Sequence, residues 1–243
     1  MPSPSLFLVP TPIGNLEDIT LRAIRTLAEV DLIACEDTRT SGVLLSHYDI
    51  TTPKTSFHAH NEHRKAIHLV EQMRDGRRIA LITDAGMPGI SDPGYLLVRS
   101  TVEAGLRVEA LPGAAAFATA LAASGLPTDR FLYEGFLPPR KGRRTRLQQL
   151  ADMDCTVVLY ESPHRIGKLL KELGDACGPN RQLVIAREIS KKFEEYLRGS
   201  VAELSAHATT RPLKGECVVV LASSRFSGRK ALGRTDNSGS DPP

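Results

Sequence analysis

Residues 6–15 read LFLVPTPIGN, a short apolar run that passes directly into a loop with two prolines and a glycine. The run Leu6-Phe7-Leu8-Val9 has the continuous hydrophobicity of a strand that is buried on both faces. Thr20 is an N-cap candidate for a following helix. The residues expected on the buried face of that helix are Leu21, Ile24, Leu27 and Ala28. This order of strand, loop and helix predicts the start of a βαβ unit.

The same alternation continues through the first half of the chain. Further strands are expected at residues 31–35, 54–57, 79–82 and 107–111. Asn61 begins a helix with Ile67, Val70 and Met73 facing inward, and Asp92 caps another whose first residue is Pro93. The repeated order predicts an α/β domain with a parallel sheet.

The second half repeats this α/β order. Strands are expected at 131–133, 156–160, 183–186 and 218–221, and a helix at 163–177 behind a Ser162 cap. The uncharged stretch 110–128 contains Pro112, Gly113, Gly125 and Pro127, which leave too short a helix to span a membrane. The sequence therefore predicts two α/β domains, residues 1–124 and 125–224, and a disordered tail at 225–243.

Composition and charge restrict the class of protein. The chain of 243 residues is 41% hydrophobic and 24% charged, ordinary values for a globular protein. Part of its formal charge of +3 comes from residues 225–243, so the rest of the chain is nearly neutral. An RNA-binding site would therefore have to consist of local clusters of basic residues. Four scattered cysteines lack zinc-site spacing, and a signal peptide is not recognisable. We expect a cytoplasmic protein with reduced thiols, no metal and no membrane association.

Two loops follow expected strands at the edge where open α/β sheets bind ligands. The first, residues 10–15, lacks the Lys-Ser/Thr pair of a Walker loop and the three glycines of a dinucleotide fingerprint, so a rigid proline turn is an open alternative. The second, residues 83–94, is rich in glycine and proline, and Asp84 offers a ligand acceptor. For Asp92, helix capping is the simpler role.

Basic residues cluster in the second half. Residues 140–146 contain five cations, Arg140, Lys141, Arg143, Arg144 and Arg146. Cations at a helix N-terminus oppose the macrodipole, so phosphate binding is a reason for them, and a solvated helix start is the alternative. A second set comprises Arg187, Lys191, Lys192 and Arg198. It is mixed with acids, so a salt-bridged surface explains it equally well.

Several motifs resemble the tetrapyrrole methylase superfamily, which binds S-adenosylmethionine in the cleft between two α/β domains. They lie at residues 8–21, 84–94 and 111–116. The motifs CEDTRT (35–40), FHAHNE (57–62), YESPHR (160–165) and AREISKKFEE (186–195) are similar to the branch that methylates a cytidine 2′-hydroxyl in small-subunit ribosomal RNA. The resemblance covers about residues 6–222 and implies S-adenosylmethionine as cofactor, this RNA or the 30S subunit as partner, and a homodimer.

The resemblance also implies cofactor-binding positions. They are Pro12, Ile13, Gly14, Asp84, Ala85, Gly86, Gly89, Ile90, Ala115, Ala116 and Glu161. The superfamily's first loop is Gly-x-Gly-Pro-Gly, whereas this chain has Pro10, Pro12 and Ile13 at the first three fixed positions. Its second loop is Gly-Gly-Asp-Pro, whereas residues 84–87 are DAGM. Where the side chains differ from those of the superfamily, the resemblance implies only backbone contacts with the cofactor.

Methyl transfer to a ribose hydroxyl requires alignment and can use a base, because the hydroxyl is a weak acid. Asp37 is our first candidate for the base, ahead of Asp84 and Glu161, and Asn61 is the candidate for orienting the hydroxyl. These carboxylates could equally bind Arg39 or the cofactor. His58, His60 and His63 surround Asn61, and we expect them to line the substrate cleft. A metabolite methylase and a non-enzymatic ribosome-binding protein remain the competing functions.

Overall fold

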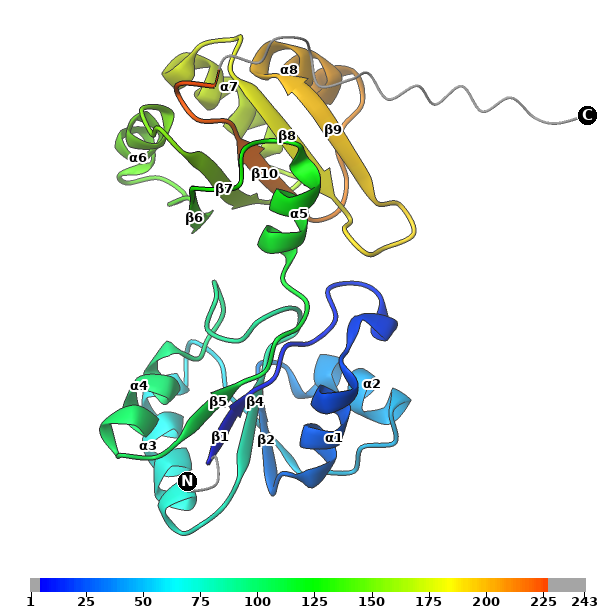
Figure 1. Ribbon diagram of the computed structural model, residues 1–243, viewed down its shortest axis with the longest axis vertical. Helices are drawn as coiled ribbons and strands as arrows, with labels where there is room; N and C mark the ends of the chain where they lie inside the picture. Colours follow the sequence, from blue (N-terminus) through cyan, green and yellow to red (C-terminus); the bar gives the residue numbers. More distant parts are fainter. Residues whose placement is uncertain (1–4, 227–243) are drawn as a thin grey trace, which may run out of the picture. The chain divides into compact units, whose positions relative to one another are not determined.

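The computed structural model describes residues 5–226, so most of the expected tail lies outside the described residues. The chain divides into two compact units, one ending at Ala116 and one beginning at Phe117 (Figure 1). This division differs from the boundary expected after Ser124. Helix α5 (Ala116–Ser124) goes with the second unit because Arg198 of that unit donates to the carbonyls of Ala123 and Ser124, at 2.6 and 3.2 Å.

The first unit is built on a parallel sheet with the strand order β3-β2-β4-β1-β5. Its strands are β1 (Leu6–Leu8), β2 (Leu32–Cys35), β3 (Lys54–Ser56), β4 (Ile79–Ile82) and β5 (Val108–Ala110). All five were expected from the sequence. Because the strands are parallel, the loops that leave β1, β2, β3 and β4 emerge at the same edge of the sheet.

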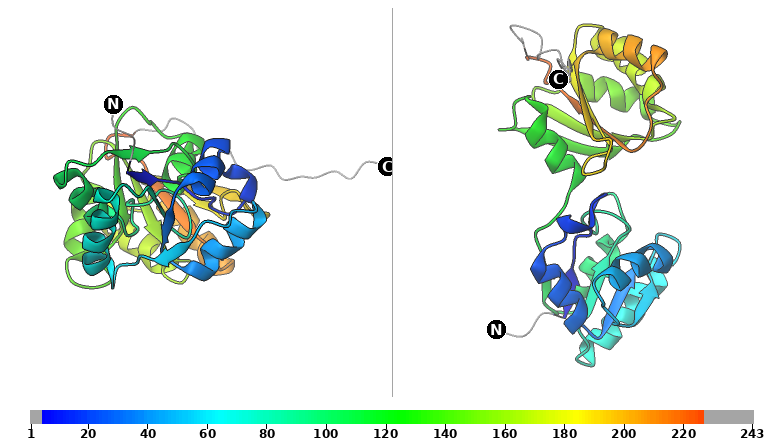
Figure 2. Two further views of the ribbon diagram at one scale, coloured as in Figure 1. Left: turned by 90° about the horizontal axis from the view of Figure 1, so that it is seen from below. Right: turned by 90° about the vertical axis from the view of Figure 1, so that its right-hand side faces the viewer.

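Helices cover both faces of this sheet (Figure 1; Figure 2). Helices α1 (Leu21–Glu29) and α2 (Thr38–His47) pack on one face, and α3 (Glu62–Arg74) and α4 (Tyr95–Glu103) on the other. A short 3-10 helix, η1 (Leu16–Asp18), precedes α1. Buried side chains from both faces of each central strand contact these layers, which explains the continuous apolar runs.

Thr20 caps α1 as expected, accepting a hydrogen bond from the Ala23 N–H at 3.0 Å. Other details of the helix expectations are wrong. Leu21 is 84% exposed and Ile67 is 64% exposed, because the buried stripes of α1 and α3 contain Ala23 and Leu27, and Ala66 and Leu69. The cap of α4 is Gly94, with φ 148°, and not Asp92. The loop after β4 is therefore longer than the capping signal indicates.

The second unit is built on a mixed sheet with the strand order β6-β7-β10-β8-β9, in which only the β6–β7 pair is parallel. Its strands are β6 (Phe131–Phe136), β7 (Thr156–Glu161), β8 (Gln182–Arg187), β9 (Glu195–Ser200) and β10 (Cys217–Leu221). The main core lies between one sheet face and helices α6 (Arg143–Ala151), α7 (Ile166–Cys177) and α8 (Val201–Thr210). Helix α5 lies on the opposite face (Figure 1; Figure 2).

One boundary and two elements of this unit differ from the sequence expectation. Helix α7 begins at Ile166, with Arg165 as its N-cap, so the Ser162-Pro163 signal precedes a turn and not the helix itself. Strand β9 and helix α8 were not expected. Ser200 and Glu203 form a capping box at the start of α8, with the Ser200 N–H donating to Glu203 Oε2 at 2.8 Å. That Ser-x-x-Glu spacing is visible in the sequence.

Candidate active site

Three loops of the first unit are joined at the carboxyl edge of its sheet. Thr11 and Gly86 form a two-hydrogen-bond bridge, each N–H donating to the other's carbonyl at 3.0 Å. The Thr11 hydroxyl also donates to the Thr83 carbonyl at 2.9 Å. A side chain on Gly113 would lie 2.7 Å from Pro10 Cβ, so the loop after β5 presses directly against the loop after β1. The edge is thus a cradle of small residues held together by backbone contacts.

The residues implied as cofactor contacts largely belong to this cradle. A Cβ on Gly86 would lie 3.6 Å from Ile13 Cγ2 and 3.9 Å from the Ala114 carbonyl, so the three loops converge at this point. Gly86 (φ 83°) and Gly89 (φ 80°) both adopt backbone conformations that favour glycine. The expected positions in the first unit are Pro12, Ile13, Gly14, Asp84, Ala85, Gly86, Gly89, Ile90, Ala115 and Ala116. Glu161 belongs to the second unit.

Three interacting carboxylates lie at the same edge. Burial raises the pKa of Glu36, and the charge of Asp84 raises it further. Burial also raises the pKa of Asp84, although the hydrogen bond from the Asp37 backbone N–H acts in the opposite direction. Burial, and then the charge of Glu36, raises the pKa of Asp92 to about 6. Glu36 was not among the sequence candidates, although it stands in the motif at residues 35–40, and for Asp92 helix capping was the preferred role. Mutual repulsion of this kind favours a bound cation.

Asp37 lies beside this group but is committed to Arg39. Its carboxylate accepts from Arg39 Nε at 3.1 Å and from Nη2 at 2.7 Å, and it also caps α2 through the Arg39 backbone N–H at 2.8 Å. These hydrogen bonds lower the pKa of Asp37 to about 2. A carboxylate with so low a pKa is a weak proton acceptor. The structure thus favours the alternative in which Asp37 binds Arg39.

Asn61 orders the turn after β3. Its side-chain oxygen accepts from the His58 N–H at 3.0 Å, and its amide nitrogen lies 3.1 Å from His58 Nε2 and 3.4 Å from the Ser56 carbonyl. These contacts fix the His58 ring close enough for its charge to influence the pKa of Glu36. Within the described residues, no group of three or more His, Cys, Asp or Glu side chains is arranged to hold a metal ion.

The raised pKa of Asp92 gives a testable pH dependence. Because the folded-state pKa is about 6 and the ordinary value is 3.8, ionisation of Asp92 destabilises the fold as pH rises through this window. We expect Asp92→Asn to be more stable than the wild type at pH 7.5 by about 1 kcal/mol, a value reduced because solvent screens the half-buried carboxylate. The difference disappears below about pH 4. Urea midpoints at both pH values measure it, and a less stable variant at pH 7.5 contradicts the assignment.

In the second unit, Glu161 at the end of β7 is a buried ion-pair centre. It is 2% exposed, and its carboxylate accepts from Arg143 Nη2 at 3.0 Å, Arg165 Nε at 2.8 Å and the Ser162 N–H at 2.9 Å. Arg143 Nε also donates to Glu172 of α7 at 2.8 Å. Both carboxylate oxygens of Glu161 are therefore occupied. The geometry favours a structural role and not that of a base.

The basic cluster at 140–146 separates into two groups. Arg143 is 4% exposed and holds Glu161 and Glu172, and Arg146 pairs with Glu134 of β6 at 2.7 Å. Arg140, Lys141 and Arg144 are exposed, and within residues 5–226 they form no ion pair. The expectation that Arg143 contacts RNA conflicts with its burial. The sequence could not separate the two groups, because the acids that neutralise Arg143 and Arg146 lie on other elements.

The second basic set is a salt-bridged surface. Arg187 Nε donates to Glu195 at 2.6 Å. Lys191 Nζ donates to Glu188 at 3.1 Å and Glu216 at 3.0 Å. Arg198 Nη2 donates to the Ala123 carbonyl of α5. Lys192 is exposed and lies over the ring of Phe193, 5.7 Å from its centroid.

Comparison with known proteins identifies the class. The family model described as Tetrapyrrole (Corrin/Porphyrin) Methylases matches residues 5–205. The chain belongs to this family and is a methyltransferase. Among curated proteins, it is similar to the "Ribosomal RNA small subunit methyltransferase I" of Haemophilus influenzae, with 50% identity over 219 residues covering 89% of this chain and 77% of that protein. The protein of the same name from Vibrio cholerae is 48% identical over 234 residues, covering 95% and 81%.

Solved structures share the fold at lower identity. The methyltransferase CobJ superposes with a TM-score of 0.68 at 22% identity, covering 93% of this chain and 98% of that one. A uroporphyrin-III C-methyl transferase from Thermus thermophilus, complexed with S-adenyl homocysteine, has a TM-score of 0.64 at 18% identity, covering 90% and 97%. These likenesses confirm the α/β architecture expected from the sequence. Within the described residues, no helix is long and apolar enough to cross a membrane.

Proposed function

We propose that the chain transfers a methyl group from S-adenosylmethionine to the 2′-hydroxyl of a cytidine in small-subunit ribosomal RNA. The identity of 46–50% to proteins named Ribosomal RNA small subunit methyltransferase I, extending over most of both chains, carries this proposal. The separation of exposed from paired cations supports an RNA substrate, because three cations remain for phosphates. A metabolite methylase does not require such a cluster.

The carboxyl edge of the first sheet fits the cofactor. S-adenosylmethionine, when bound, supplies a methyl group activated on a positively charged sulfonium. The glycines and alanines within residues 84–89 and 113–116 have little or no side chain, so a ligand can approach the backbone of these loops closely. The carboxylates of Glu36, Asp84 and Asp92 repel one another, and a cation beside them relieves this repulsion.

A proton acceptor for the ribose hydroxyl is also present among these groups. Glu36, Asp84 and Asp92 have raised pKa values, so each is a better proton acceptor than Asp37, whose pKa is lowered. We assign the role of base to this group and a positioning role to Asp37 and Asn61. Glu161 and Arg143 hold the end of β7 and the start of α6 together.

Transfer of labelled methyl from S-adenosylmethionine to small ribosomal subunits tests the proposed function. The subunits are purified from a strain that lacks this protein, and free ribosomal RNA is assayed beside them. Incorporation into RNA supports the proposal. Cofactor binding without incorporation into either RNA substrate favours a metabolite methylase, and loss of both activities favours a ribosome-binding protein.

Two further properties belong to the same proposal. The family resemblance implies a homodimer, and the solution mass of the full chain decides between one copy and two. The reaction requires access to ribosomal subunits, so we assign the protein to the cytoplasm.

A further inference from the structure

A β-bulge in β6 places an unusual row of aromatic side chains on one sheet face. The register with β7 pairs Phe131 with Thr156 and Tyr133 with Val158, then shifts so that Phe136 pairs with Tyr160. Glu134 is the extra residue, and Gly135 supplies the required positive φ of 68°. The shift returns Phe136 to the face that carries Tyr133, away from the core that Leu132 contacts.

The aromatic rings on this face form a continuous series. Phe117 contacts Tyr133 with centroids 4.6 Å apart, Tyr133 contacts Tyr160 at 5.5 Å, and Tyr160 contacts Phe136 at 5.4 Å. The Phe117 N–H donates to the Tyr160 hydroxyl at 3.1 Å, which fixes the centre of the series. Phe136 stands at its end and is 55% exposed. A rigid, exposed ring supported by other rings is a stacking platform.

The exposed cations come four, five and eight residues after Phe136 in the chain. Arg140 and Lys141 lie in the loop between β6 and α6, and Arg144 in the first turn of α6. Arg143 secures this loop, because its guanidinium binds the Pro138 carbonyl at 3.4 Å as well as Glu161. The bulged Glu134, the nearest acid on β6, is neutralised by Arg146. The loop that leaves β6 after Phe136 therefore carries exposed cations that form no ion pair within the described residues.

We propose that Phe136 and the cations Arg140, Lys141 and Arg144 form a binding surface for single-stranded RNA, in which a nucleobase stacks on the Phe136 ring and the cations contact flanking phosphates. The inference deepens the proposed function by assigning a contact to the RNA substrate. A duplex does not fit this surface, because its bases are already stacked and their faces are covered. An aromatic ring beside cations is the combination that binds unpaired nucleotides.

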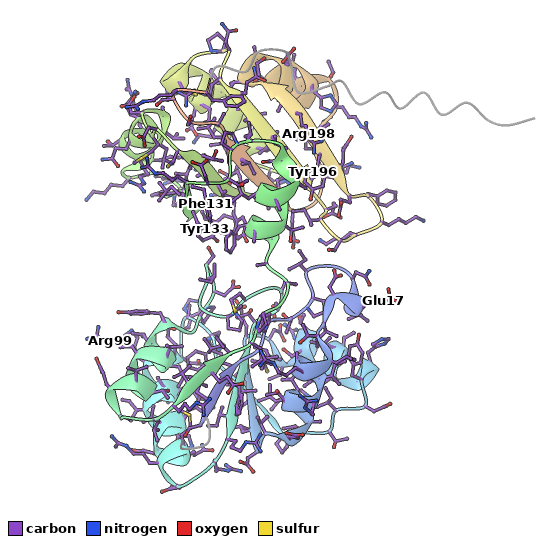
Figure 3. The ribbon with its side chains drawn as sticks, viewed as in Figure 1. Glu17, Arg99, Phe131, Tyr133, Tyr196 and Arg198 are labelled. Carbon is purple, nitrogen blue, oxygen red and sulfur yellow. The ribbon has the colours of Figure 1, made fainter. Side chains whose placement is uncertain are left out.

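Phe131 provides a matched control on the same strand. It is 45% exposed and is the first residue of β6, whereas Phe136 is the last. Phe131 and Tyr133 are labelled in Figure 3. The nearest cation in the sequence, Arg130, pairs with Asp154 at 3.6 Å. Phe131→Ala therefore removes an exposed ring of similar accessibility without touching the charged loop.

The experiment measures binding of a short fluorescent single-stranded RNA to the full chain over a range of salt concentrations. We expect Phe136→Ala and Phe136→Leu to weaken binding about tenfold with an unchanged salt slope, Phe136→Trp to retain affinity, and Phe131→Ala to change it less than about twofold. The triple variant Arg140→Ala, Lys141→Ala, Arg144→Ala should reduce the slope of log K against log salt by about 2. S-adenosylmethionine affinity should be unchanged in all of them.

Three results overturn the inference. Full RNA affinity in Phe136→Leu shows that apolar bulk suffices and that no base stacks. If Phe136→Ala binds S-adenosylmethionine more weakly but keeps its RNA affinity, the ring contacts the cofactor. If the wild type is a dimer and Phe136→Ala is a monomer, the ring contacts a second copy of the chain. If the wild type methylates small subunits and Phe136→Ala keeps its RNA affinity, the proposed function is supported and the RNA surface is not. If RNA binding depends on Phe136 but no methyl group is transferred, the RNA surface is supported and the proposed function is not.

Discussion

Arg143→Met is expected to lower the free energy of unfolding by about 3 kcal/mol, whereas Arg144→Met one residue later changes it by less than about 0.5 kcal/mol. Arg143 is 4% exposed and binds Glu161 and Glu172, so its removal leaves the buried Glu161 carboxylate with Arg165 as its remaining guanidinium. Arg144 is exposed. Urea midpoints of the two variants measure the difference.

A second substitution separates lost pairing from lost packing. Adding Glu161→Gln to Arg143→Met removes the poorly compensated charge, so the double variant should recover part of the lost stability. Equal urea midpoints for Arg143→Met and Arg144→Met contradict the structural role of Arg143. So does an Arg143→Met protein of normal stability whose RNA binding has a reduced salt slope, because that result assigns Arg143 to phosphate binding.

Asp84→Asn is expected to weaken S-adenosylmethionine binding at least tenfold without unfolding the protein. The asparagine oxygen can still accept the Asp37 N–H that Asp84 Oδ1 accepts at 3.2 Å, so the loop keeps its hydrogen bond while the negative charge is lost. A tenfold change corresponds to about 1.4 kcal/mol, which is modest for the removal of one charge from a cationic site. Titration calorimetry measures it.

Asp75→Asn is the matched control for this substitution. Asp75 is an exposed aspartate at the C-cap of α3, and α3 begins just after β3 at the carboxyl edge, so its far end lies at the opposite edge of the sheet. Unchanged cofactor affinity in Asp84→Asn, or an equal loss in Asp75→Asn, is incompatible with a cofactor site formed by the loop after β4.

The regular parts of the fold were predictable because local signals and burial agree there. Apolar runs such as residues 79–82 predicted buried parallel strands, and Thr20 predicted a helix cap. The Asp92-Pro93 pair predicted the start of the next helix too early, because Gly94 is the N-cap of α4. Tertiary ion pairs also lay beyond sequence reasoning, since Glu161 and Glu172 reach Arg143 from distant elements.

Among the site residues, backbone-dependent positions were easier to predict than roles of charged side chains. The spacing around Gly86 placed the loop correctly at the sheet edge, where it is joined to Thr11. The sequence left open whether Asp37 acts as a base or binds Arg39, and only the structure shows that Arg39 folds back and lowers the pKa of Asp37 to about 2. The exposed Phe136 depends on a one-residue bulge that the alternation in residues 131–136 does not show.

The proposed methylation of a cytidine ribose in small-subunit ribosomal RNA can be tested directly by nucleoside analysis. The RNA is analysed after incubation with the protein and S-adenosylmethionine, with untreated subunits from a strain lacking the protein as the reference. We predict the appearance of 2′-O-methylcytidine, resistant to alkaline cleavage at its 3′ side, and its absence with Asp84→Asn at limiting cofactor. Methyl groups found only on bases, or none in the RNA despite cofactor binding, would contradict the account.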